Sequence, residues 1–369
     1  MKRVLVFGMT ENPGGVESFL MNYYRHINRE KIQFDFLCNS YEPVAYEDEL
    51  IEMGGRTFHI TSRRKNRALF YKELDELFSA HSEEWSAIWV NVCSLANIDY
   101  LKIAKKYGIK KRIIHSHNSE NMDNFVRGVL HTANRHTIEK YATDFWACSE
   151  DAAKWFYNSR IMKKAIVIRN AIDVQKFLFN SENRKEIRSQ INATEGEIII
   201  GNVGRLHFQK NQTFAIEVFN EFLKKRPDSR LILIGQGEDR ENLMKKCAAL
   251  GISEKVMFAG IQSNVEKWLS AFDLFLFPSL FEGLSVVALE AQANGVTVLA
   301  SEGVIPKEVK MNENFEFFSL DKSAEEWSGI LETMTGYPRP NRDTVCESFH
   351  RRGFDIEEEV KKLEQLLLI

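Results

Sequence analysis

Two glutamates, Glu282 and Glu290, are the side chains whose type and spacing most clearly suggest chemistry. They stand in FPSLFEGLSVVALEAQANG, after the apolar run DLFLF, which ends at Pro278. The run predicts a buried parallel strand, and the residues after Gly283 predict a helix. Glu282 then falls in the loop at the carboxyl end of a strand, and Glu290 falls in the following helix. Open α/β sheets bind ligands at that edge. We therefore predict that the two carboxylates accept hydrogen bonds from hydroxyls of a sugar-bearing ligand.

A second motif, GNVGRLHFQKNQ, combines a predicted strand with two cations. The loop after the strand carries Arg205 and Lys210, and a helix is expected from about Gln212. A helix dipole disfavours cations at that end, so an anion lying between them and the helix amides is one explanation. A diphosphate fits, because Arg binds it in a bidentate way and Lys supplies a mobile point charge. Two solvated loop cations are the other explanation, and the motif alone leaves both open.

Two glycine motifs are less specific. Gly235 and Gly237 in RLILIGQGEDRENL follow a predicted strand, with Glu238 at the start of the next helix, and Gly14 and Gly15 precede a helix near the N-terminus. Glycine lets the backbone approach a ligand closely. A tight turn explains each motif as well, and an acidic residue suits a helix N-terminus. The third glycine of a dinucleotide fingerprint is missing, which disfavours a nicotinamide dehydrogenase.

Polar residues also end two strands of the first half. In IIHSHNSEN, His115 and His117 differ by two positions, so both side chains face one way on a strand. A histidine there could donate to or accept from a sugar hydroxyl, or stabilise charge at a phosphate. Alternatively, one histidine is buried and hydrogen-bonded and the other is exposed, and two histidines alone make no metal site. In VIRNAIDVQKF, Asn170 and Asp173 stand at a spacing that often only shapes a turn.

The predicted elements alternate between strands and helices along the whole chain. Strands are expected at RVLVFG, FDFLC, AIWVNV, KRIIHSH and DFWACS, and again at IIIGNVG, RLILIG, KVMFAG, DLFLFPS and TVLAS. This alternation predicts two parallel, doubly wound sheets. The boundary between them is expected in the charged, strand-poor stretch 173–197. The tail FDIEEEVKKLEQLLLI predicts an amphipathic helix.

The composition excludes several classes of protein. A length of 369 residues suggests two domains, and a net charge of -3 argues against a dedicated nucleic-acid binder. Five dispersed cysteines without a CxxC motif argue against a disulfide set or a zinc site, so a reducing cytoplasm is the default. The apolar stretch at the N-terminus is too short for a signal peptide, and we expect no membrane span.

Basic residues cluster in two places in the first half of the chain. One cluster runs from Arg63 to Arg67 beside Leu69, and the other runs from Lys102 to Arg112. Peripheral contact with an anionic lipid surface is one interpretation. A solvated helix face is the other, and it is the commoner arrangement.

Taken in order, the motifs resemble those of the retaining GT-B glycosyltransferases of family 4, especially the capsular and exopolysaccharide type. The resemblance runs from GGVES to FDIEEEVKKLEQL, and its most specific part includes the E-x7-E motif from Glu282 to Glu290. RNAID is similar to the family's NGID element, with Ala171 where glycine is usual. The resemblance implies an α/β fold of two doubly wound, Rossmann-like domains that face a central cleft. Residues 1–175 would form the acceptor-side domain and residues 176–345 the nucleotide-sugar-binding domain, and residues 346–369 would cross back to the first domain.

The resemblance also implies residue roles. Arg205 and Lys210 match the pair that binds the donor diphosphate, and Glu290 matches the carboxylate on the ribose hydroxyls. Glu282 matches the glutamate near the transferred sugar, and His117 matches the active-site histidine. The remaining positions expected to bind the donor are Gly15, Asn170, Gly204, Gly235, Gly237, Glu238, Gly283, Leu284 and Ser285.

The implied reaction moves a sugar from a nucleoside-diphosphate donor to a saccharide acceptor, with retention of anomeric configuration, in surface polysaccharide biosynthesis. We expect a UDP-hexose or UDP-N-acetylhexosamine donor, a polyprenyl-diphosphate-linked acceptor, and no metal or other cofactor. The expected location is the cytoplasm, at the inner face of the cell membrane if the lipid contact is real. Two alternatives stay open: a nucleotide-sugar epimerase of the same fold, and a non-catalytic nucleotide-sugar-binding partner of another transferase.

Overall fold

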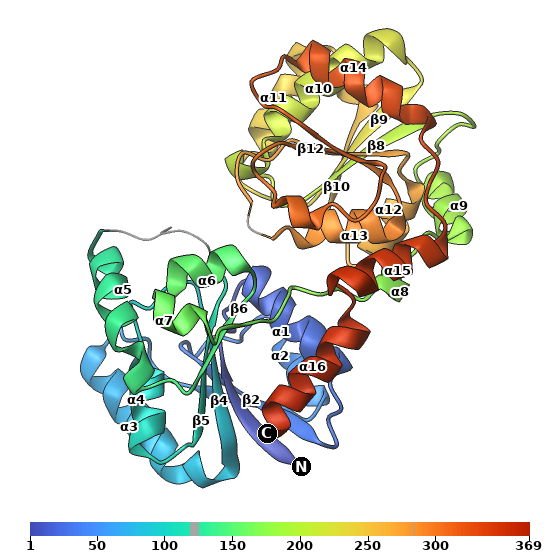
Figure 1. The fold of residues 1–369 in the computed structure, drawn as a ribbon. Coiled ribbons are helices and arrows are strands. Elements are labelled where there is room, and N and C mark those ends of the chain that lie inside the picture. Colours follow the sequence, from blue (N-terminus) through green and yellow to red (C-terminus); the bar gives the residue numbers. More distant parts are fainter. Residues whose placement is uncertain (119–124, 283) are drawn as a thin grey trace. The chain divides into compact units, whose positions relative to one another are not determined.

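The computed structural model describes residues 1–118, 125–282 and 284–369, which form two compact units (Figure 1). The first unit contains residues 1–171 together with the C-terminal residues 356–369. The second unit contains residues 172–355. Each unit is built around one parallel sheet with helices on both faces, so the predicted pair of doubly wound sheets is confirmed.

The first unit has a seven-stranded parallel sheet in the order β3-β2-β1-β4-β5-β6-β7. Its strands are β1 Lys2–Phe7, β2 Ile32–Cys38, β3 Arg56–His59, β4 Trp85–Val92, β5 Lys111–Ser116, β6 Asp144–Ala147 and β7 Ile166–Val167. Its α-helices are α1 Gly15–His26, α2 Glu47–Glu52, α3 Arg67–His81, α4 Asp99–Lys106, α5 Phe125–Thr137, α6 Glu150–Phe156, α7 Ser159–Met162 and α16 Ile356–Leu368. Alternate side chains of one strand enter opposite cores: Val4 and Val6 of β1 face one, and Leu5 faces the other.

The second unit has a six-stranded parallel sheet in the order β10-β9-β8-β11-β12-β13. Its strands are β8 Ile198–Val203, β9 Ser229–Ile234, β10 Val256–Gly260, β11 Leu274–Phe277, β12 Thr297–Ser301 and β13 Phe315–Phe318. Its α-helices are α8 Val174–Phe177, α9 Ser181–Gln190, α10 Gln212–Lys225, α11 Arg240–Ala249, α12 Val265–Ala271, α13 Val286–Asn294, α14 Ala324–Thr333 and α15 Arg342–Arg352. The run DLFLF forms β11, whose phenylalanines and leucines pack into opposite cores.

The division between the units differs in detail from the expected one. The first unit ends at Ala171, and the stretch 173–197 is not a linker, because it contains α8 and α9. Asp173 caps the N-terminus of α8, since its side chain accepts a hydrogen bond from the backbone amide of Lys176 at 3.0 Å. Arg184 of α9 donates to Asp273 at 2.6 Å, which ties the stretch to the second unit.

The C-terminal segment divides between the two units. Helix α15 belongs to the second unit, whereas α16 packs on the first, where Lys362 donates to the carbonyl of Val167 at 2.7 Å. The Lys2 side chain donates to the Leu368 carbonyl, so the two termini lie side by side (Figure 1). No helix within the described residues is both long and apolar enough to cross a membrane.

Candidate functional site

In the second unit, the predicted residues gather in the loops that follow β8, β9 and β11. These are neighbouring strands of one parallel sheet, so their carboxyl ends share one edge. Backbone contacts join the loops: Leu280 donates to the Gln209 carbonyl at 2.8 Å, and Leu206 donates to the Gln236 carbonyl at 3.0 Å. The Gln209 side chain donates to the Phe281 carbonyl at 3.0 Å. The three loops therefore form one connected surface.

Lys210 and Glu282 form a buried ion pair in this surface. The lysine Nζ lies 2.6 Å from the glutamate Oε1, and the side chains are only 16% and 7% exposed. Nζ also lies 5.0 Å above the centre of the Phe277 ring. Gly204 has a φ of +156°, and a Cβ there would lie 3.0 Å from Cε of Lys210. Glycine at this position therefore leaves room for the lysine stem.

Arg205 and Glu238 form a second ion pair, which is exposed. The arginine Nη2 lies 3.0 Å from the glutamate Oε2, and the side chains are 68% and 52% exposed. His207 Nε2 lies 3.4 Å from the other oxygen of Glu238. A hydrogen bond from its own backbone amide, followed by the charge of Arg205, lowers the pKa of Glu238. Both predicted diphosphate-binding cations thus have carboxylate partners.

The packing of the loops explains why glycine occurs at positions 235 and 237. A Cβ on Gly235 would lie 2.1 Å from the Gly204 carbonyl oxygen, and a Cβ on Gly237 would lie 2.1 Å from the Leu206 carbonyl oxygen. A side chain at either position would push the loops after β8 and β9 apart. Close packing of the two loops therefore accounts for both glycines, and donor contact by their backbone stays a prediction.

Helix α13 begins beside this surface. Ser285 is its N-cap, and the buried Oγ has no hydrogen-bond partner among the described residues. Leu284 is half-buried against the hydrophobic core, and Gly283 lies outside the described residues. Of the three amides predicted to meet a phosphate, the structure therefore describes those of Leu284 and Ser285.

Glu290 lies in the second turn of α13 and differs from the paired glutamates. Burial raises its pKa to about 7, with a smaller lowering effect from Lys176 and a raising effect from Glu266. Within the described part of the chain, its carboxylate forms no hydrogen bond or ion pair. It is thus separate from the Lys210–Glu282 pair, and it has acceptor capacity that no protein donor uses.

In the first unit, His117 follows β5 and contacts Asn91 of β4. Nε2 of His117 lies 2.9 Å from Oδ1 of Asn91. The ring centres of His115 and His117 lie 4.2 Å apart, so both side chains share one face as predicted. His115 is fully buried and His117 is half-buried. Burial lowers the pKa of His117 to about 3 and holds that of His115 well below its usual value, so both rings are neutral.

The other predicted residues of the first unit are Gly15 and Asn170. Gly15 begins α1, and a Cβ there would meet no atom within 4 Å. Asn170 is 9% exposed, and its buried Oδ1 has no partner among the described residues. The geometry shows open space beside Gly15 and an oxygen without a partner at Asn170, and it assigns a role to neither.

Two polar residues of the site were missed by the sequence reasoning. Gln212 is buried at the start of α10, and its side chain donates to the Arg205 carbonyl at 3.0 Å. Asn91 is buried inside β4 and contacts His117. The available signal for Asn91 was one amide within the otherwise apolar strand AIWVNV.

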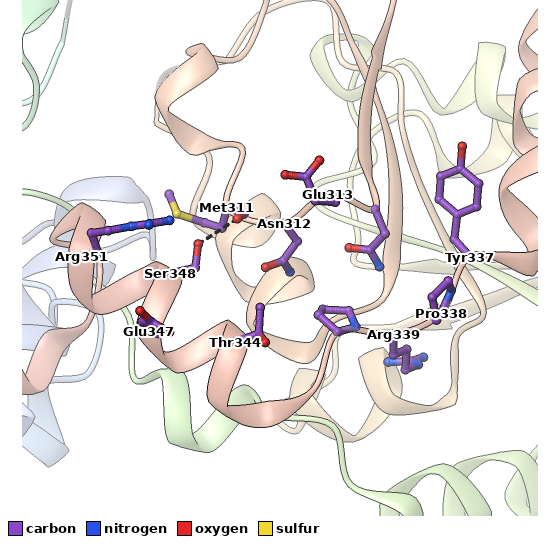
Figure 2. Close-up of a pocket in the computed structure, with 12 residues that line it drawn as sticks. Met311, Asn312, Glu313, Tyr337, Pro338, Arg339, Thr344, Glu347, Ser348 and Arg351 are labelled. Atoms are coloured by element: carbon purple, nitrogen blue, oxygen red, sulfur yellow. Dashed lines mark hydrogen bonds between the residues drawn. The ribbon is translucent and has the colours of Figure 1, made fainter.

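A cavity of about 470 Å³ lies elsewhere in the second unit, between the segment before β13 and helix α15 (Figure 2). Its wall includes Met311 and Ser348, joined by a hydrogen bond of 2.8 Å, and it contains none of the predicted site residues. Because it lies at the amino ends of β12 and β13, it is at the sheet edge opposite the loops described above. Among the described residues, no group of three or more His, Cys, Asp or Glu side chains is arranged to hold a metal ion.

Comparison with solved structures identifies the fold class. HepE of Anabaena, crystallised in complex with UDP, superimposes with a TM-score of 0.78 over 100% of both chains at 16% identity. WaaG, described as a glycosyltransferase involved in lipopolysaccharide biosynthesis, superimposes with a TM-score of 0.66 over 99% of both chains at 13% identity. The chain therefore has the GT-B fold of two Rossmann-like units.

Sequence comparison finds similarity to glycosyltransferases. Residues 183–334 match the family model of the glycosyl transferases group 1, and this segment holds the three loops. EpsF of Bacillus subtilis (strain 168) is 28% identical over 98% of this chain and 95% of its own length. An Escherichia coli protein named UDP-Gal:alpha-D-GlcNAc-diphosphoundecaprenol alpha-1,3-galactosyltransferase is 25% identical over 56% of this chain and 54% of its own. The matched segment lies entirely within the second unit.

Proposed function

We propose that the chain transfers a sugar from a UDP-sugar to a saccharide acceptor, with retention, in the synthesis of a surface polysaccharide. The observation that carries the proposal is the buried Lys210–Glu282 pair at the carboxyl ends of β8 and β11, with Arg205 exposed beside it. HepE was crystallised with UDP, which makes UDP the first nucleotide to test. The name of the E. coli relative supports a diphosphate-lipid-linked saccharide as the acceptor.

In this mechanism the cations act on the leaving group. Negative charge collects on the diphosphate as the anomeric bond breaks, and positive groups that are already in place lower the barrier. An ammonium has three N–H donors, so Lys210 can keep its bond to Glu282 while it donates to phosphate. Arg205 can turn from Glu238 to the diphosphate at little cost, since that ion pair is exposed. Glu282, held by Lys210, accepts from a hydroxyl of the transferred sugar.

Retention by double displacement would require a carboxylate nucleophile close to the anomeric carbon. In the second unit, Glu282 is held by Lys210 in an ion pair, which suits the orientation of a hydroxyl better than attack on carbon. We therefore favour departure of the diphosphate and attack by the acceptor on the same face of the sugar. Two cations and the amides at the start of α13 would take the place of a metal ion.

A lipid-linked acceptor would require contact with the membrane, and we propose the basic cluster from Arg63 to Arg67 for this role. Arg64, Lys65 and Arg67 are exposed, and Leu69 is 37% exposed next to them. Cations beside apolar side chains suit the cytoplasmic surface of an anionic membrane. Co-sedimentation with anionic and neutral vesicles tests this, and equal recovery with both would contradict it.

Calorimetric titration with UDP and a panel of UDP-sugars tests the nucleotide site. Arg205→Ala should lower the affinity at least tenfold, because a hydrogen bond to a charged group contributes about 1.5–3 kcal/mol. Lys267→Ala is the matched control, since Lys267 also forms an exposed ion pair in the second unit, 2.9 Å from Glu186. Equal affinity of Arg205→Ala and wild type would overturn the assignment.

Product analysis separates the alternatives. A transferase gives a lengthened saccharide only when acceptor is present. An epimerase converts the donor sugar without acceptor, and a non-catalytic partner binds the donor and forms neither product. Either of the last two results would contradict the proposed reaction.

A further inference from the structure

The contact between Asn91 and His117 depends on the orientation of the Asn91 side-chain amide. Oδ1 of Asn91 lies 2.9 Å from Nε2 of His117, and Asn91 is only 2% exposed. The amide is also oriented on its other side, because Nδ2 donates to the Phe7 carbonyl at 3.2 Å and to the Trp89 carbonyl at 3.4 Å. Carbonyl oxygens only accept hydrogen bonds, so they require the NH₂ group on their side. The oxygen of Asn91 therefore faces the histidine.

This orientation determines the tautomer of His117. The amide oxygen accepts only, so the Nε2 that faces it must carry the ring proton. Burial lowers the pKa of the ring to about 3, which keeps a second proton off at neutral pH. Nδ1 is then a lone-pair acceptor, and it has no hydrogen-bond partner among the described residues. Of the three roles that the sequence left open, only acceptance from a hydroxyl fits.

The residues that pack around the His117 ring are consistent with this tautomer. Phe19 of α1 lies edge-on, with its ring centre 4.8 Å from that of His117, and the ring centre of His115 lies 4.2 Å from it. His115 is the ionisable group of the described structure that packs against His117, and burial keeps it neutral. Its Nδ1 accepts from the indole of Trp89 at 3.3 Å, so its ring proton is also on Nε2.

We propose that Asn91 is a positioning residue, which presents Nδ1 of His117 as an acceptor for a hydroxyl of the sugar donor or the acceptor saccharide. The proposal rests on the proposed function, since it assigns His117 to the same reaction. It further excludes His117 as a cation for the diphosphate, and leaves that task to Arg205 and Lys210. Asn91 itself would touch neither substrate.

Nitrogen-15 spectra of histidine in the full-length protein test the tautomer directly, without any substrate. Wild type should show protonated Nε2 and unprotonated Nδ1 for His117 from pH 5 to 9. Asn91→Leu has a similar size and no acceptor, so His117 should show a mixture of tautomers. A protonated Nδ1 in wild type, or an unchanged pattern in Asn91→Leu, would overturn the proposal. Asn202→Leu, which replaces a buried asparagine of β8, is the control and should leave the spectrum unchanged.

A second variant, Asn91→Asp, covers the case in which Asn91→Leu does not fold. Its carboxylate keeps an acceptor for Nε2 and favours the imidazolium, so the pKa of His117 should rise from about 3 toward its usual range. Below the raised pKa, Nδ1 carries a proton and cannot accept. The ratio of kcat/KM for this variant to that for wild type should therefore fall as the pH is lowered from 8 to 5, by about tenfold. A constant ratio would contradict the proposal.

The two hypotheses fail in different ways. If wild type transfers no sugar from any UDP-sugar, the proposed function is wrong, and the histidine spectra still decide the role of Asn91. If transfer occurs but a bound UDP-sugar and acceptor leave the Nδ1 resonance of His117 unshifted, the assignment of Nδ1 as a substrate acceptor is wrong.

Discussion

Two ion pairs of the second unit have the same charges and different surroundings. The Lys210–Glu282 pair joins the loops after β8 and β11, and its side chains are 16% and 7% exposed. The Arg205–Glu238 pair joins the loops after β8 and β9, and its side chains are 68% and 52% exposed. Solvent screens the second pair, whereas the first has lost its water on folding. We therefore expect the buried pair to matter for the stability of the fold, and the exposed pair to exchange its partner for a ligand.

Removal of one partner from the buried pair should have the largest effect. Lys210→Ala would leave the Glu282 carboxylate buried without a counter-ion, which typically lowers the free energy of unfolding by about 3–5 kcal/mol. Urea denaturation at pH 7 measures this. In the double variant Lys210→Met/Glu282→Leu, neither charge is left, and most of the loss should be recovered.

Lys246→Ala is the control for this prediction. Lys246 forms an ion pair with Glu217 in the same unit, but those side chains are 27% and 42% exposed. Its loss should lower the free energy of unfolding by less than about 1 kcal/mol. If Lys210→Ala and Lys246→Ala lose equal stability, burial does not distinguish the two kinds of pair.

Glu290 extends the comparison to a half-buried carboxylate that forms no ion pair with the described residues, and its effect should be the next largest. Its pKa is raised from the ordinary value of 4.5 to about 7, so the folded state holds the proton more tightly than the unfolded state. The penalty for ionisation is absent below pH 4.5 and complete above pH 7. Wild type should therefore lose up to about 3 kcal/mol relative to Glu290→Gln as the pH rises through this range. Urea midpoints at pH 4.5, 6 and 8 measure the difference.

The same group also allows a test of the predicted contact between Glu290 and the ribose hydroxyls. Hydroxyls that donate to Glu290 favour its ionised form, so the binding of a UDP-sugar at pH 6.5 should release protons. Calorimetry in buffers of different ionisation enthalpy measures this release, which Glu290→Gln should abolish. Equal proton release by wild type and variant would show that another group titrates on binding.

The sequence predicted the sheets and the shared edge because strand ends are marked locally. The run DLFLF and the loop glycines indicate β11 and its loop without any knowledge of the rest of the fold. The strands β3 Arg56–His59 and β13 Phe315–Phe318 were missed; both are four-residue edge strands, in which only one neighbour contributes hydrogen bonds.

The partners of the site residues could not be predicted in the same way. The pairing of Lys210 with Glu282 joins positions 72 residues apart, and that of His117 with Asn91 depends on the register of β4 and β5. A sequence motif states which side chains follow a strand, but it does not state which of them meet in three dimensions. The motif left open whether its two cations bind an anion or are solvated, whereas each cation has a carboxylate partner in the structure.

The smallest effect that we expect is a difference between the two ion pairs in how their contribution to stability depends on salt. Mobile ions reduce the Debye length from about 8 Å at 0.15 M to about 3 Å at 1 M, and they screen exposed charges far more than buried ones. Arg205→Ala should lower the urea midpoint slightly at 0.15 M NaCl and should leave it equal to wild type at 1 M. The difference between Lys210→Ala and wild type should be the same at both concentrations, because ions do not reach the buried pair. A salt-dependent difference for Lys210→Ala would mean that water enters the site, and its ion pair would then exchange with ligands as readily as that of Arg205.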